Sequence, residues 1–181
     1  QPFTSALVMS NTKMFKYETI WIKNQPTGIG LSNKRPMKYH ENILIFCKGN
    51  TTYNKQKSER WSDKAKSVVR NGVGGANTAN SENTNISSKV PPKRFYDENN
   101  VNPKSVLFFD CVANGGGKRL HPTQKPIALF EYLIKTYTNE NDLVLDNTAG
   151  SGTTAIACLN TKRQFIVMEK EQKYYDIILK R

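Results

Sequence analysis

A glycine-rich loop between two short apolar segments constrains the fold of this chain more than any other feature. The loop runs from Asp146 to Thr154 (DNTAGSGTT) and directly follows the apolar segment 142–146 (DLVLD). A second apolar segment, 165–168 (FIVM), comes after a stretch of helical character from 153 to 160. Strand, helix and strand joined by short links predict a parallel crossover unit, with the loop at the carboxyl end of the first strand. We expect both strands to be buried.

The composition of this loop predicts a ligand site. Glycines let the backbone approach a ligand closely, and the following helix would direct free N–H groups at an anionic or polar part of it. Glu169 lies 23 residues after Asp146, at the end of the second strand, where a carboxylate can accept hydrogen bonds from ribose hydroxyls. The spacing does not match the G-x-G-x-x-G dinucleotide loop, and no Lys follows the glycines as in a phosphate-cradling P-loop.

Strand and helix patterns cover much of the remaining chain. Residues 16–23 and 41–48 are rich in β-branched and aromatic residues, which predicts an antiparallel pair with the second strand buried on both faces. We expect the first strand to end where Pro26 begins a Pro- and Gly-containing stretch. The connection between the strands is basic through Lys34, Arg35 and Lys38. The other predicted elements are helices over 3–10, 126–137 and 174–180 and a strand over 105–111.

The segment from 49 to 104 has a different character. Basic residues recur in its first part around Tyr53 and Trp61, and residues 71–88 are mostly Gly, Asn, Ser and Thr, a composition that predicts a mobile loop. The whole chain has 27 Lys and Arg against 15 Asp and Glu, a formal charge of +12, which favours a polyanionic partner or serves solubility alone. We predict DNA contacts by Lys55, Lys57, Arg60, Trp61, Lys64 and Lys66; the alternative is an amphipathic surface segment with its aromatic residues in a small core.

Composition also excludes several classes of protein. No apolar run approaches the roughly 20 residues that would span a bilayer, and the N-terminus does not read as a secretion signal. The three cysteines lie far apart and the two histidines are isolated, so we expect free thiols in a reducing cytoplasm and no metal site. Because the chain starts at Gln1 and not at Met, we expect a fragment or a processed product.

Three segments together resemble the C-terminal half of the permuted, beta-class DNA amino-methyltransferases. They are HPTQKP at 121–126, the loop at 146–154 with Thr148 where that family commonly has Phe, and the acid Glu169. The resemblance implies a Rossmann-like α/β methyltransferase fold that uses S-adenosylmethionine. It also implies which residues would bind this cofactor: Thr123, Lys125, Asp146, Thr148, Gly150, Ser151, Gly152, Thr153 and Glu169.

The same resemblance implies a domain organisation and a function. Residues 1–48 would be structural strands of the methyltransferase sheet, 49–104 an inserted target-recognition region, and 105–181 the cofactor-binding part. The implied activity is site-specific methylation of adenine N6 in double-stranded DNA, with cytosine N4 as the alternative. We expect a cytoplasmic enzyme of a prokaryotic or phage-encoded restriction-modification system, without membrane contact.

The motif that would hold the target base is absent from this sequence. In the resembled family, D/N/S-P-P-Y/W grips the flipped base, whereas Pro91–Pro92–Lys93 lacks both the polar residue and the aromatic residue. The resemblance implies that this motif lies upstream of Gln1 on a central strand. We therefore assign no catalytic residue here and expect an incomplete sheet, completed by a missing N-terminal part or a second copy. The alternatives are a truncated or degenerate DNA-binding module without catalysis and, less favoured, a methyltransferase for RNA or small molecules.

Overall fold

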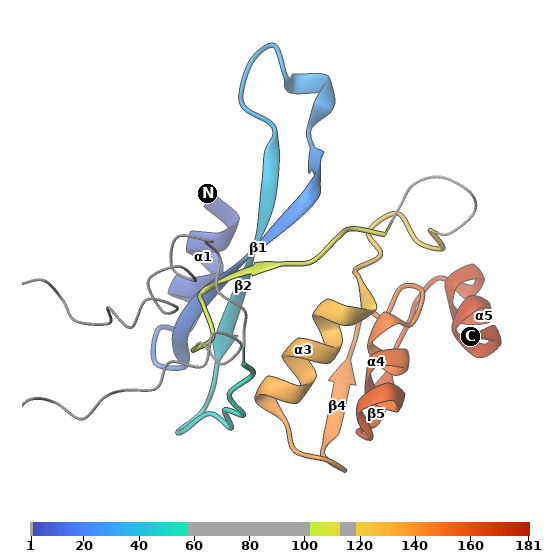
Figure 1. Ribbon diagram of the computed structural model, residues 1–181. Coiled ribbons are helices and arrows are strands. Elements are labelled where there is room, and N and C mark those ends of the chain that lie inside the picture. Colours follow the sequence, from blue (N-terminus) through green and yellow to red (C-terminus); the bar gives the residue numbers. More distant parts are fainter. Residues whose placement is uncertain (1, 58–101, 113–118) are drawn as a thin grey trace, which may run out of the picture. The chain divides into compact units, whose positions relative to one another are not determined.

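The computed structural model describes residues 2–57, 102–112 and 119–181. The described residues within 1–56 and 104–181 form one compact unit, which contains the elements described below. No helix in the described part is long and apolar enough to cross a membrane. The elements in chain order (Figure 1) are α1 (Pro2–Ser10), β1 (Phe15–Thr27), the 3-10 helix η1 (Ile29–Leu31), β2 (Lys38–Phe46), β3 (Val106–Phe108), α3 (Ile127–Tyr137), β4 (Leu143–Asp146), α4 (Thr153–Thr161), β5 (Gln164–Val167) and α5 (Gln172–Lys180).

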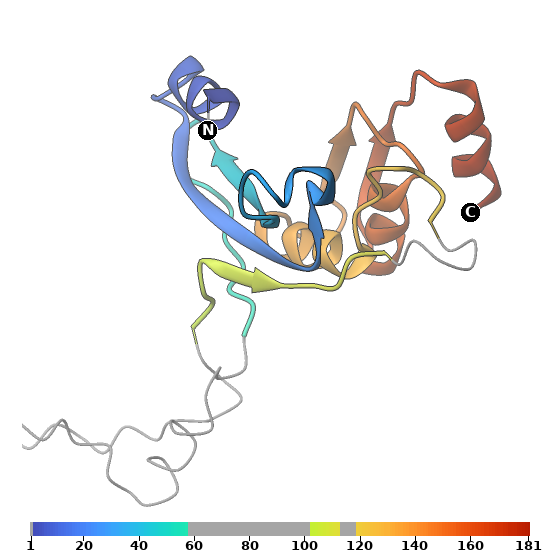
Figure 2. The same ribbon diagram turned by 90° about the horizontal axis from the view of Figure 1, so that it is seen from above.

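The first sheet has the strand order β2-β1-β3. The strand β1, which is long and curved (Figure 2), pairs antiparallel with β2 and parallel with β3, so the predicted antiparallel pair is confirmed. Its core is Trp21, only 3% exposed, packed with Leu107 of β3 and Leu129 of α3. The indole N–H of Trp21 donates a hydrogen bond of 2.8 Å to the carbonyl of Phe109, which satisfies the one polar atom of this buried ring.

Two details of this hairpin differ from the predictions. The strand β1 continues through Pro26 to Thr27, with a register shift between Ile22 and Thr27, because an irregular stretch of ladder tolerates a residue without an N–H. The strand β2 is half-buried along its length, not buried on both faces. None of its residues is fully buried, so its apolar run is not fully covered on either face.

The second sheet pairs β4 and β5 in parallel, joined through the helix α4. This confirms the parallel crossover predicted around the glycine-rich loop. One face of the pair packs through Val144 and Phe165 against a core of Ile134, Ala157 and Cys158. The thiol of Cys158 is free and buried in this core.

The prediction that β4 and β5 are buried strands is wrong for one of their faces. Leu143 is 58% exposed, Leu145 62% and Ile166 47%. These side chains alternate with half-buried ones, so they point to the opposite face of the sheet. Among the described residues, no strand pairing joins this sheet to the first one. The apolar sequence predicts strands that are covered on both faces, whereas the described residues cover only one face.

A partly buried ion-pair network connects the first hairpin to the segment before α3. The carboxylate of Glu41 on β2 contacts Lys23 of β1 at 3.3 Å and Lys125 at 2.9 Å. The side chain of Lys23 is 3% exposed, so its charge depends on this partner. Burial pushes the pKa of Glu41 upward, but the hydrogen bonds and charges of Lys125 and Lys23 outweigh it and hold that pKa below its ordinary value.

We predict that Glu41→Gln lowers the free energy of unfolding by about 1–3 kcal/mol, because it leaves the ammonium group of Lys23 buried without a carboxylate. Chemical denaturation followed by circular dichroism measures the change. The matched control is Glu18→Gln on β1, where the exposed carboxylate accepts a hydrogen bond from Asn42; its effect should stay within about 0.5 kcal/mol. Equal effects of the two substitutions would contradict a stabilising role for the network.

Candidate functional site

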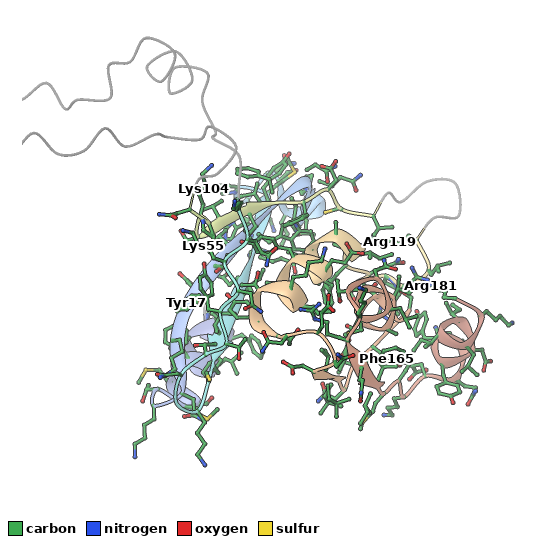
Figure 3. The ribbon with its side chains drawn as sticks, turned by 60° about the horizontal axis from the view of Figure 1, so that its bottom comes forward. Tyr17, Lys55, Lys104, Arg119, Phe165 and Arg181 are labelled. Carbon is green, nitrogen blue, oxygen red and sulfur yellow. The ribbon has the colours of Figure 1, made fainter. Side chains whose placement is uncertain are left out.

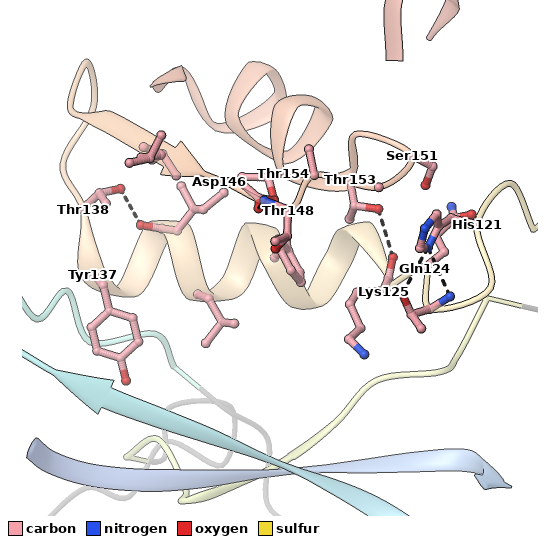
Figure 4. Close-up of a pocket in the computed structure, with 18 residues that line it drawn as sticks. His121, Gln124, Lys125, Tyr137, Thr138, Asp146, Thr148, Ser151, Thr153 and Thr154 are labelled. Carbon is pink, nitrogen blue, oxygen red and sulfur yellow. Dashed lines mark hydrogen bonds between the residues drawn. The ribbon is translucent and has the colours of Figure 1, made fainter. Parts of the chain in front are cut away.

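A cavity of about 490 Å³ lies where the segment before α3 meets the glycine-rich loop. This volume is within the range of small-molecule sites, roughly 300–1,000 Å³. Its walls come from residues 121–125, from α3, from the end of β4 and from the loop (Figure 4). Of the residues predicted to bind a cofactor, it brings together Thr123, Lys125, Asp146, Thr148, Gly150, Ser151 and Thr153.

The carboxylate of Asp146 shapes the loop from inside. One oxygen accepts a hydrogen bond of 3.0 Å from the backbone N–H of Thr148, and the other accepts a hydrogen bond from the hydroxyl of Thr154. Asp146 therefore ties the end of β4 to the first turn of α4. These bonds involve both of its oxygens in the loop's own structure while the residue still lines the cavity.

The glycines of the loop adopt backbone conformations that other residues rarely adopt. Gly150 has φ +56° and Gly152 has φ +81°, and Gly152 is the N-cap of α4 without any side-chain cap. The first-turn N–H groups of this helix are therefore not capped by a side chain and carry the positive end of the helix dipole. Such a helix start favours an anionic or polar ligand group.

Ser151 has a hydroxyl that lacks a partner inside the protein. The residue is 2% exposed, it lines the cavity, and its Oγ makes no hydrogen bond to the described residues. A buried hydroxyl without a partner costs free energy. A polar ligand atom in the cavity would remove this cost.

Glu169 supports the loop from the neighbouring strand. Its carboxylate accepts hydrogen bonds of 2.8 Å from the backbone N–H groups of Gly150 and of Glu171. These N–H groups, that of Glu171 foremost, hold the pKa of Glu169 below its ordinary value. Glu169 does not line the cavity, and neither does Gly152, so direct ligand contact by either residue stays a prediction.

The helix α5 and His121, which also lines the cavity, pack against the loop. The imidazole of His121 stacks edge-on against Tyr174 of α5, with 4.1 Å between ring centroids, and lies 3.3 Å from where a Cβ on Gly150 would be. Arg181 donates a hydrogen bond of 2.8 Å to the carbonyl of Ser151. His121 therefore packs between Tyr174 of α5 and Gly150 of the loop.

Lys125 and Thr123 occupy the loop segment before α3. Figure 4 shows the side chain of Lys125 extending away from the glycine-rich loop, and its ammonium group contacts Glu41. Its carbonyl accepts a hydrogen bond of 3.3 Å from Thr153, so its backbone faces the loop. Thr123 donates its backbone N–H to His121 Nδ1 at 3.2 Å. Lys125 therefore has an established structural partner, and its predicted contact with a cofactor stays a prediction.

Of the residues predicted to contact DNA, the structure describes two. Lys55 (Figure 3) and Lys57 are both exposed. The other predicted DNA contacts, Arg60, Trp61, Lys64 and Lys66, lie outside the described residues, as does the predicted mobile loop 71–88.

Sequence reasoning missed several residues that shape the site. Thr154 was available as the second threonine after the glycines, and Glu41 as the one acidic residue between Glu18 and Glu59. Asn54 anchors the segment after β2 on the end of α3: its backbone N–H donates to the carbonyl of Thr136 at 2.7 Å, and its side-chain amide donates to the carbonyl of Thr138 at 2.8 Å. No local pattern marks Asn54, because its partners are more than 80 residues away.

Comparisons with known proteins identify the family. A family model described as DNA methylase (N6_N4_Mtase) matches residues 3–180. The chain belongs to the DNA methylase family. It is 30% identical over 158 residues to the Type II methyltransferase M.HindIII of Haemophilus influenzae, across 87% of this chain and 44% of that relative. It is 36% identical over 97 residues to the Type II methyltransferase M.HpaI of Haemophilus parainfluenzae, across 51% of this chain and 31% of that relative.

Solved structures agree with this DNA methylase assignment. The chain matches the crystal structure of an M1.HpyAVI–SAM complex with a TM-score of 0.63 at 25% identity, over 99% of this chain and 69% of that one. It matches the cytosine-N4-specific PvuII DNA methyltransferase with a TM-score of 0.60 at 18% identity, over 98% of this chain and 55% of that one. The predicted α/β methyltransferase fold and the DNA amino-methyltransferase family are thereby confirmed, while the permuted beta class stays a prediction. The chain spans less than half of both curated relatives.

We predict that Gly152→Ala destabilises this DNA methylase strongly. A Cβ there would lie 3.1 Å from Ile178 of α5, and the left-handed backbone alone costs about 1–2 kcal/mol for a non-glycine residue. Two controls separate these effects in denaturation experiments. Gly28→Ala has φ +87° and open space, so it tests the backbone alone, and Gly30→Ala has open space without a positive φ. A loss for Gly152→Ala no larger than that for Gly28→Ala would show that contact with α5 is unimportant.

Proposed function

We propose that the cavity binds S-adenosylmethionine. The observation that carries this proposal is the buried, unpartnered hydroxyl of Ser151 in a cavity of about 490 Å³ at the start of α4. A neighbour in fold is a complex with this cofactor. The cavity combines apolar walls from Leu133, Ile134 and Val144 with the polar groups of the loop, which suits a ligand that has an aromatic base, a ribose and a charged amino-acid end.

The residues of this chain would bind and orient the cofactor. The helix start and Ser151 would receive an anionic or polar group, while the carboxylate of Asp146 would favour a positively charged or hydrogen-donating group. When bound, S-adenosylmethionine supplies an electrophilic methyl group. The loop's contribution is positioning, since its backbone is held by Asp146 and Glu169 before any ligand arrives.

We further propose that the whole protein methylates an exocyclic amine of double-stranded DNA, adenine N6 first and cytosine N4 as the alternative. Family membership supports the DNA substrate. One relative is named a Type II methyltransferase, and one neighbour in fold is named cytosine-N4-specific. The basic residues from Lys55 to Lys66 are proposed to contact the DNA backbone, where such side chains add salt-dependent affinity.

The active site is proposed to be shared with a further segment, either the N-terminal part of the same protein or a second copy. Three exposed apolar side chains, Leu143, Leu145 and Ile166, line one face of β4 and β5, and β4 has a partner strand on one side only among the described residues. A segment that carries the D/N/S-P-P-Y/W motif on a strand would pair with β4, and further parts of that segment would cover this face. Its target-binding groups would then stand beside the cofactor cavity.

We propose a bacterial or phage-encoded cytoplasmic enzyme as the biological setting. The relatives compared above come from Haemophilus species. Their names place them among Type II methyltransferases, which supports a role in restriction and modification.

Calorimetric titration with S-adenosylmethionine tests the cofactor site. Ser151→Ala should weaken binding about tenfold without lowering stability, because the hydroxyl has a partner only when ligand is bound. Asp146→Ala should weaken binding and also destabilise the loop. Ser32→Ala, at an exposed position, is the matched control and should leave binding unchanged. Equal affinity of Asp146→Ala and the unaltered protein would refute the assignment.

Transfer of a tritiated methyl group to duplex DNA tests the activity. We expect transfer by the intact protein that includes a D/N/S-P-P-Y/W segment, and none by residues 1–181 alone. Transfer by residues 1–181 alone would contradict the shared active site. Absence of transfer by the intact protein, with cofactor binding retained, would favour a DNA-binding module without catalysis.

A further inference from the structure

The connection between β1 and β2 forms a small ordered tip that carries only positively charged side chains. Residues 24–40 contain Lys34, Arg35 and Lys38 and no Asp or Glu. Residues 30–37 are all exposed, and Figure 1 shows them as a helical turn and loop at the end of the strand pair. Neither Lys34 nor Arg35 contacts an acidic side chain among the described residues. This basic tip, defined as residues 28–37, therefore presents two cations to solvent.

Backbone hydrogen bonds hold the basic tip in one shape. The N–H of Leu31 donates to the carbonyl of Gly28 at 2.9 Å, and the N–H groups of Lys34 and Arg35 both donate to the carbonyl of Leu31, at 2.9 and 3.0 Å. At its base Thr27 pairs with Lys38 across the hairpin. Because the two cations stand on an ordered turn, less conformational entropy is lost when a partner binds them.

The basic tip also exposes apolar side chains. Leu31 is 40% exposed and Met37 is 38% exposed, close in sequence to Lys34 and Arg35. Cations next to exposed apolar groups match the surface of duplex DNA, where phosphates flank the sugars and base edges of a groove.

We propose that the basic tip is a second DNA-docking surface, separate from the insert at 49–104. Lys34 and Arg35 contact backbone phosphates, while Leu31 and Met37 lie against the sugars of the same groove. Phosphate contacts position a protein on the duplex without reading its sequence. The tip therefore adds affinity and orientation, and the insert is left to determine the recognition sequence. This inference rests on the proposed function only in taking duplex DNA as the substrate.

The test measures the binding of residues 1–181 to a short, fluorescently labelled DNA duplex by anisotropy at several salt concentrations. Lys34→Ala combined with Arg35→Ala should weaken binding roughly tenfold at low salt and reduce the slope of log K against log salt by about 2, one unit for each phosphate contact. Leu31→Ala should weaken binding without changing this slope, because it removes no charge.

The matched control is Lys170→Ala combined with Lys180→Ala, which removes the same charge from exposed positions outside the basic tip. If this control reduces the slope as much as the tip variant does, the effect is net charge alone and the inference is overturned. Calorimetry with S-adenosylmethionine and thermal melting should give unchanged values for the tip variant, which shows that its fold is intact.

Two further outcomes separate this inference from the proposed function. If the unaltered chain binds no duplex, the proposed DNA substrate fails together with the inference. If the chain binds duplex and the tip variant binds equally well, the inference alone fails. Loss of binding to phosphatidylserine vesicles with DNA binding unchanged would assign the tip to a membrane surface and overturn the proposal.

Discussion

The hydrogen bonds from the glycine-rich loop to two carboxylates are the interaction on which the rest of the site depends. Asp146 accepts hydrogen bonds from Thr148 and Thr154, and Glu169 accepts one from Gly150. Both acids stand at or just after the ends of the parallel strands β4 and β5, so they approach the same loop from two sides. The loop therefore keeps its left-handed glycines and its uncapped helix start in place without a ligand. A ligand meets a surface that is already organised, which reduces the entropy lost on binding.

Ion pairs of Glu41 connect the N-terminal hairpin to the segment that forms one wall of the site. Glu41 accepts hydrogen bonds from Lys23 on the neighbouring strand and from Lys125, 84 residues later. The network fixes the segment before α3, and the carbonyl of Lys125 in turn accepts a hydrogen bond from Thr153 of α4. Lys125 thus stabilises the fold through the charge of its side chain, while its backbone carbonyl helps to build the cavity. The family resemblance implies that Lys125 binds the cofactor, and the structure shows that it also stabilises the fold through Glu41.

The exposed face of β4 and β5 has the opposite character. Its apolar side chains Leu143, Leu145 and Ile166 are exposed to solvent. Burial of these three side chains would contribute several kcal/mol to the free energy of association, at roughly 25 cal/mol per Å². Native surfaces seldom leave such a strip without a partner. The free energy released by burying this face would therefore be available to hold the proposed additional segment.

The sequence by itself determined the local elements and the crossover, because both follow from short-range periodicity and from turn residues. The strand, loop and helix around Asp146 to Thr154 follow from that pattern, and so does the helix that begins after Pro126. Only the tertiary structure decided burial and partnership. An apolar run does not say whether both faces are covered, so β2, β4 and β5 were predicted more buried than they are. A motif also does not determine which partner a side chain contacts. Lys125 binds Glu41, and Asn54 caps the end of α3, and neither contact follows from a local sequence pattern. Long-range packing sets these contacts, since the residues concerned meet only after the chain has folded.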